Sequence, residues 1–149
     1  MSLSLEPVDA GSWRAVYDVA PRPDQSRWVS PVARYLALCA YGQQWQPLTI
    51  RVDDDVVGFV MWAVDDDGSH WIGGLVIDAG CQGRGHGRAA LLALLERFAA
   101  SGQEGYRRAG AALSYDPDNA VARELYRSLG FVETGEREDD EVVARRPGG

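Results

Sequence analysis

The sequence predicts an α/β protein with a mixed central sheet flanked by helices. Two observations predict this class. Short stretches with strand-like and helix-like hydrophobic patterns alternate along the chain, and a glycine-spaced turn joins an apolar β-type run to an apolar helix. The expected order is strand, helix, helix, three strands, helix, strand, helix and two strands. With 149 residues and no linker or repeat, the chain is expected to form one domain over 1–149.

The first third should supply an edge strand and two helices. Residues 3–8 alternate weakly between apolar and polar, as a strand at the edge of a sheet does. Apolar residues then recur at helical spacing over 13–20, and Ser12 is the expected N-cap. A second helix is expected over 32–38, closing near Gly42.

Three strands and two acidic turns follow. Residues 48–52 and 56–62 are predicted to form an antiparallel hairpin around the turn 53–55. A second acidic turn, 65–68, leads into a strand over 70–77. Neither turn has the spacing of a calcium loop, which ends in a distant glutamate, so we interpret the aspartates as turn formers.

The last part of the chain predicts two helices and three strands. The helix from 85 to about 100 is apolar nearly all round and should be buried against the sheet. A strand over 111–115 and a turn over 116–119 lead to a helix that ends at Leu129, with Gly130 as a left-handed C-cap. Residues 131–133 and 142–144 are expected to close the fold as a hairpin.

Charge and composition exclude several classes of function. The formal net charge of −7 argues against a nucleic-acid partner. No apolar run approaches the roughly 18 residues of a membrane span, and the N-terminus lacks the pattern of a signal peptide. Cys39 and Cys81 have no metal-ligand spacing, so we expect no metal, free thiols and a cytoplasmic location.

A glycine-spaced loop is the strongest chemical signal. It follows the apolar run 75–77 and places glycine at alternate positions between Gln82 and Arg88, where backbone N–H groups and a helix N-terminus can bind an anion. Arg84 adds positive charge, so we predict a pyrophosphate site. The chain has no lysine for a Walker A loop, and Arg88 replaces the third glycine of a dinucleotide fingerprint. A glycine-rich turn without a ligand remains the alternative.

Two motifs resemble a known family. Gln-x-x-Gly-x-Gly at 82–87 resembles the acyl-CoA loop of the GNAT superfamily of N-acetyltransferases. Asn-x-x-Ala-x-x-Leu-Tyr-x-x-Leu-Gly-Phe at 119–131 resembles its second signature, although a capped helix with a packed tyrosine explains that stretch alone. The stretches 57–61, 113–115 and 133–136 also resemble bacterial diamine and polyamine N-acetyltransferases.

The resemblance implies a site and acetyl-CoA as cosubstrate. The backbone of Leu75, Val76 and Ile77 would pair with the pantetheine arm, and the pyrophosphate would lie on Gln82, Gly83, Arg84, Gly85, His86, Gly87 and Arg88. Asn119 would bind the pantetheine end, Arg123 would lie near the nucleotide, and Tyr126 would act beside the sulfur as the catalytic acid.

The implied reaction is direct attack of an amine on the thioester. The expected acceptor is the primary amine of a small cation such as a diamine or polyamine, and a homodimer is possible, as in related enzymes. Gly73 and Gly74 stand where relatives often carry a base, which leaves water, His70 or a distant carboxylate. The alternatives are an acyl-CoA-binding sensor or partner module with little turnover, and an enzyme for another small amine.

Overall fold

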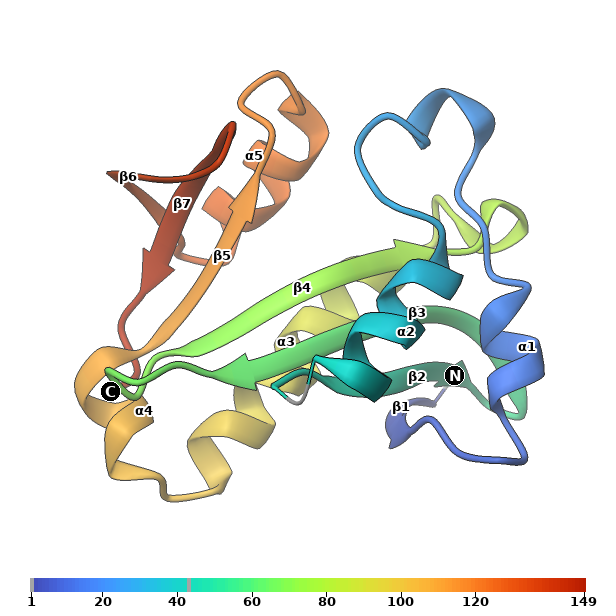
Figure 1. The fold of residues 1–149 in the computed structure, drawn as a ribbon, viewed down its shortest axis with the longest axis horizontal. Helices are drawn as coiled ribbons and strands as arrows, with labels where there is room; N and C mark the ends of the chain where they lie inside the picture. Colours follow the sequence, from blue (N-terminus) through green and yellow to red (C-terminus); the bar gives the residue numbers. More distant parts are fainter. Residues whose placement is uncertain (1, 43) are drawn as a thin grey trace. The chain divides into compact units, whose positions relative to one another are not determined.

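A mixed seven-stranded sheet forms the centre of the fold, which confirms the predicted α/β class. The structure is a computed structural model that describes residues 2–42 and 44–149. Its strands follow the order β1-β2-β3-β4-β5-β7-β6 (Figure 1). The strands are β1 Leu3–Pro7, β2 Gln46–Val52, β3 Asp55–Val64, β4 His70–Ile77, β5 Ala111–Tyr115, β6 Val132–Glu138 and β7 Glu141–Arg146. The helices are α1 Trp13–Tyr17, α2 Val32–Tyr41, α3 His86–Ala100, α4 Glu104–Ala109 and α5 Ala120–Ser128, with 3₁₀ turns η1 Pro23–Gln25 and η2 Ala79–Cys81.

The chain divides into two compact units, and the first contains Met1–Ala63 and Gly74–Leu94. Here β1, β2 and most of β3 form an antiparallel meander, in which Leu5 pairs with Ile50 and Thr49 pairs with Phe59. Helix α2 contacts α1 and β2. The core of this unit contains Val16, Val19, Val32, Phe59, Met61 and Val76. Burial of these apolar side chains holds the two helices and the end of β4 together.

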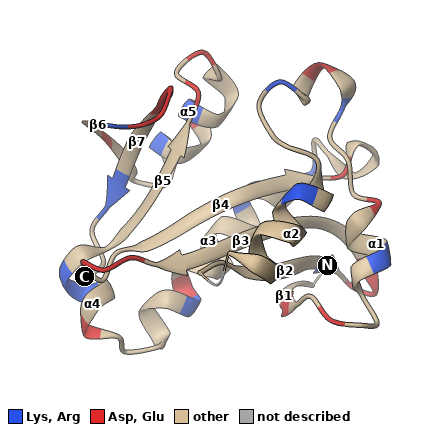
Figure 2. Ribbon diagram, viewed as in Figure 1, with Lys and Arg blue, Asp and Glu red and all other residues tan. Residues whose placement is uncertain are grey.

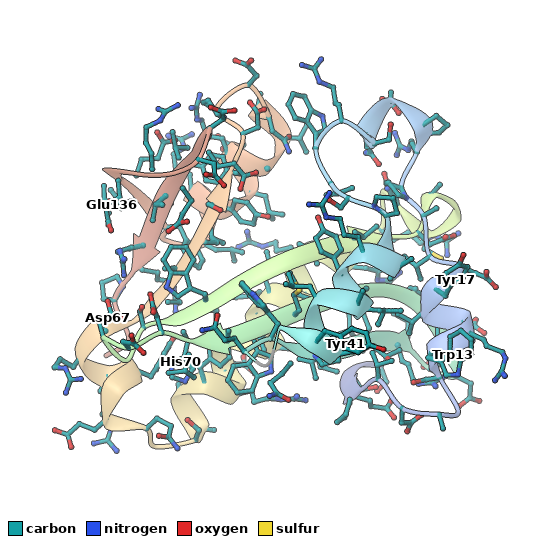
Figure 3. All side chains as sticks on the ribbon, in the orientation of Figure 1. Trp13, Tyr17, Tyr41, Asp67, His70 and Glu136 are labelled. Carbon is teal, nitrogen blue, oxygen red and sulfur yellow. The ribbon has the colours of Figure 1, made fainter. Side chains whose placement is uncertain are left out.

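The second unit contains Val64–Gly73 and Leu95–Gly149. The start of β4 pairs with β5 in parallel, and β7 runs antiparallel to both β5 and β6. Arg145 on β7 binds Glu136 on β6 through two hydrogen bonds of 2.8 and 3.1 Å and lies 3.8 Å from Asp67 in the β3–β4 turn. Figure 3 labels Asp67, Glu136 and the neighbouring His70.

The start of α1 differs from its prediction. Ser12 occupies the N-cap position, but its hydroxyl accepts a hydrogen bond from the Asp9 N–H, while the Asp9 carboxylate accepts from Gly11 and Ser12. The side chain that accepts from the last two backbone N–H groups before α1 is therefore that of Asp9, not that of Ser12. Helix α1 ends at Tyr17, earlier than the helical spacing predicted, and Val16 is its buried residue. Trp13 and Tyr17 project from α1 and are largely exposed (Figure 3).

Two further differences concern the helices that follow the glycine-spaced loop. Helix α3, expected to be apolar nearly all round and buried against the sheet, buries Leu91, Leu94 and Phe98 but leaves Leu92 39% exposed. The helix therefore buries one broad stripe. Helix α4 was not predicted because its six residues contain one large apolar side chain, the buried Tyr106.

Within residues 2–42 and 44–149, no helix is both long and apolar enough to cross a membrane. The same residues include no group of three or more histidine, cysteine, aspartate or glutamate side chains placed to hold a metal ion. Cys39 and Cys81 are free thiols, as predicted.

Candidate active site

The sequence-predicted site residues fall into two groups, one in each unit. The first group begins at the end of β4. Gly74 has a φ of +62°, and a methyl group there would lie 3.2 Å from the Phe59 ring and 3.3 Å from the Tyr35 ring. The left-handed backbone favours glycine at this position, and the two rings leave little room for a side chain. Beyond it, Val76 points into the core, while Leu75 and Ile77 remain partly exposed.

The loop after β4 is held at its start by a glutamine. The Gln82 side-chain amide donates 2.9 Å to the carbonyl of Ile77 and 2.7 Å to the carboxamide oxygen of Gln25. Gln25 in turn donates 3.0 Å to the Gln82 carboxamide oxygen. The side chain of Gln82 therefore fixes the loop, and the contact of Gln82 with pyrophosphate that the resemblance implied remains a prediction. No pattern in the sequence pointed to Gln25, which lies 57 residues away.

The middle of the loop has the backbone of an anion-binding nest. Gly83 has a φ of +79° and Gly85 a φ of +80°, separated by the exposed Arg84. Left-handed residues at alternate positions turn successive N–H groups toward one side. A methyl group on either glycine would meet no atom within 4 Å. Glycine is thus required for backbone conformation, and the space around the loop is open.

Helix α3 begins directly behind this nest. The carbonyl of Gly85 accepts the first helical hydrogen bond, 3.0 Å from the N–H of Ala89. His86 is buried, Gly87 is partly buried and Arg88 is exposed. The first N–H groups of a helix have no intrahelical acceptor and carry the positive end of the helix dipole. The loop, the helix end and the arginines can together bind a pyrophosphate.

The second group lies on α5. Asn119 caps this helix, because its side-chain oxygen accepts 3.2 Å from the N–H of Ala122. The other end closes as a Schellman motif. Gly130, with a φ of +92°, donates to the Arg127 carbonyl, and Phe131 donates to the Tyr126 carbonyl. The predicted left-handed cap is confirmed.

Tyr126 is held by its neighbours at this helix end. Its ring lies 6.2 Å from the Phe131 ring in an edge-to-face arrangement and 5.4 Å from the Tyr115 ring. The side chain is half-buried. Because the backbone cap and two aromatic contacts act on one residue, the phenol of Tyr126 has a defined place within this unit.

Arg123, one helical turn before Tyr126, is bound to a carboxylate. Its Nε donates 2.9 Å to Oε2 of Glu133, which also accepts a 2.6 Å hydrogen bond from the hydroxyl of Tyr115. The hydrogen bond from Tyr115, assisted by Arg123, lowers the pKa of Glu133. Burial, followed by the bond to Glu133, raises the pKa of Tyr115 to about 12. Its Nε thus binds Glu133, and the position near a nucleotide that the resemblance implied for Arg123 remains a prediction.

A general base is not evident at the predicted positions. Gly73 and Gly74 provide no side chain. His70 is 4% exposed, lies between the rings of Phe98 and Tyr106, and has its Nδ1 3.1 Å from the carbonyl of Gly68. An imidazole enclosed in this way is a packing group, which argues against the suggestion that His70 is the base.

The family model described as the acetyltransferase (GNAT) family matches residues 13–131. The chain therefore belongs to this family, and it is a GNAT N-acetyltransferase that uses acetyl-CoA as cosubstrate. It is 27% identical over 143 residues to the spermine/spermidine N(1)-acetyltransferase of Bacillus subtilis (strain 168), with 91% of each chain covered.

Solved structures share the fold. The spermidine N-acetyltransferase of Vibrio cholerae, in complex with CoA and spermine, matches with a TM-score of 0.71 and 17% identity, covering 96% of this chain and 92% of that one. The ribosomal-protein-S18-alanine N-acetyltransferase of Escherichia coli matches with a TM-score of 0.71 and 20% identity, covering 98% and 94%. One fold thus carries enzymes named for very different acceptors, so the fold does not identify the amine.

Proposed function

We propose that this enzyme transfers the acetyl group of acetyl-CoA to a primary amine of a small cationic acceptor, a diamine or polyamine. The single observation that carries the cofactor side of the proposal is the open glycine nest at the start of α3. Positive φ angles at Gly83 and Gly85 align backbone donors there, and Arg84 and Arg88 flank them. Such a nest is suited to bind a diphosphate group.

The remaining site residues then take the following roles. The backbone of Leu75–Ile77 pairs with the amide-containing pantetheine arm, as an added strand would. Asn119 retains its side-chain NH₂ for that arm, because its oxygen caps α5. Arg123 keeps guanidinium N–H groups besides Nε, so an interaction with the nucleotide is compatible with its bond to Glu133.

The chemistry is a direct displacement. The nitrogen of the neutral amine attacks the acetyl carbonyl, the C–N bond forms, and the C–S bond breaks. The thiolate of CoA takes a proton from the Tyr126 hydroxyl, and the nitrogen releases its extra proton to solvent or to a water chain. The Tyr126 phenolate regains a proton from the same solvent, which restores the acid. Because amines of this class have solution pKa values near about 10, activity should rise with pH through the neutral range.

The acceptor class rests on charge and on the curated relative. The formal net charge is −7, and acidic residues are frequent along the β6–β7 hairpin (Figure 2). Such a field speeds encounters with cations and is screened by salt. The relative from Bacillus subtilis is named for spermine and spermidine.

A competition assay tests the proposal. Spermidine, spermine and putrescine are compared with amino acids and aminoglycosides by kcat/KM, at low and high salt. We expect the polyamines to be preferred, with a preference that weakens at high salt. A higher kcat/KM for a neutral or anionic acceptor would contradict the polyamine assignment and leave the acetyltransferase activity intact.

A further inference from the structure

The connection between α1 and α2, residues 18–31, forms hydrogen bonds with the glycine-spaced loop and the residues just before it at two points. At the first point, Ala20 donates 3.1 Å to the carboxylate of Asp78, and its carbonyl accepts 2.8 Å from the N–H of Ala79. Asp78 also accepts from Gly80. The start of the loop is therefore joined by one side-chain and one backbone hydrogen bond to a segment far away in sequence.

The second point is a reciprocal pair of amides. Gln25 and Gln82 each donate to the other's carboxamide oxygen, at 3.0 and 2.7 Å. The second N–H of Gln82 donates to the Ile77 carbonyl, and the oxygen of Gln25 also accepts from the backbone of Arg22. Both side chains are half-buried. One pair of side chains thus links the 18–31 connection, the end of β4 and the loop.

We propose that Gln25 is a positioning residue for the acyl-CoA loop, and that filling the loop stabilises the 18–31 connection. This inference rests on the proposed function, because it takes the loop as the pyrophosphate site. Gln25 acts through Gln82, which holds the loop against Ile77 at the edge of the nest. Coupling between two segments is reciprocal, so a ligand that stabilises the loop must also stabilise the connection.

The Arg27–Trp28 peptide bond provides a local readout. Arg27 is exposed, and its guanidinium lies 4.2 Å from the centre of the Trp28 ring. Trypsin cleavage at this bond requires local opening of the connection. The cleavage rate, followed by mass spectrometry of the fragments, measures how far CoA suppresses local opening of the connection.

The variants are Gln25→Leu, Gln82→Leu and the double substitution, with Ser26→Ala as control. Ser26 is adjacent, and its hydroxyl donates to Pro23 within the same connection. In the wild-type protein, saturating CoA should slow cleavage at Arg27 several-fold. Gln25→Leu should weaken CoA binding roughly 5-fold, as expected for lost neutral hydrogen bonds, and abolish most of the protection.

The pattern of effects distinguishes a positioning role of Gln25 from a general loss of structure. The KM for acetyl-CoA should rise in Gln25→Leu while kcat at saturation stays within about twofold of the wild-type value. The double variant should bind CoA no more weakly than Gln82→Leu alone, because each single substitution already removes the same pair of hydrogen bonds. Ser26→Ala should behave as wild type. Wild-type CoA affinity and protection in Gln25→Leu, or additive losses in the double variant, would overturn the inference. A wild-type protein that fails to bind CoA would instead contradict the proposed function.

Discussion

Tyr115 on β5 and Glu133 on β6 are joined by a 2.6 Å hydrogen bond that passes over β7, in which the phenol is the donor. The strand between them contributes Ala144, which pairs with Glu133 on one side and with Leu113 on the other. Glu133 also accepts a hydrogen bond from Arg123. A single carboxylate therefore connects two strands to helix α5, the helix that carries Tyr126.

This arrangement predicts the acid sensitivity of the protein. The pKa of Glu133 is lowered in the folded state from its ordinary value of 4.5, so its contribution to stability is present above that pH and is lost as the pH falls through the lowered pKa. We expect Glu133→Gln to be less stable than wild type at pH 7. Thermal unfolding monitored at pH 7, 5 and 3 should show this difference shrinking toward acid. A constant difference would contradict the role of the ionised carboxylate.

The glycine loop predicts opposite effects for two neighbouring substitutions. Gly85→Ala should cost about 1–2 kcal/mol because of its left-handed backbone, although its side chain would meet no atom within 4 Å. Gly87 lies in α3, and a methyl group there would contact Ile77 at an ordinary 3.7 Å. Gly87→Ala should keep or raise the free energy of unfolding, by up to about 1 kcal/mol. Denaturant unfolding of both variants checks this, and equal losses would contradict the backbone explanation.

Arg84 and Arg88 should affect cofactor affinity and leave the chemical step unchanged. Each alanine variant should weaken acetyl-CoA binding by about 1–3 kcal/mol, the value of a lost charge-assisted contact. Arg107→Ala is the charge-matched control, since Arg107 is an exposed residue of α4 that donates to Gly102. Isothermal titration with CoA provides the affinity. An unchanged value in both loop variants would exclude the proposed pyrophosphate contacts.

Tyr126→Phe should separate binding from turnover. The ring contacts with Tyr115 and Phe131 are kept, and only the hydroxyl is removed. We expect CoA affinity to remain within about twofold and kcat to fall roughly 100-fold through loss of the acid. Steady-state kinetics at saturating acetyl-CoA provides this comparison. If kcat is unaffected, Tyr126 is a packing residue of the Schellman motif.

Local sequence patterns predicted the strands, the glycine loop and the cap at Gly130, because each depends on nearby hydrophobic spacing or on one backbone conformation. Helix α4 was missed because Tyr106 alone gives no periodicity. The bonds of Gln25 to Gln82 and of Tyr115 to Glu133 were missed because they join segments 57 and 18 residues apart. A single domain over 1–149 remains a prediction, since the structure describes two compact units.

Transfer of the acetyl group itself tests the central claim most directly. The purified protein is mixed with acetyl-CoA and spermidine, and free CoA thiol and acetylated amine are quantified together by mass spectrometry. We predict that the two products appear in equal amounts and that Tyr126→Phe slows both alike. Tight binding of CoA with neither product formed would contradict the account and would favour an acyl-CoA-binding module with little turnover.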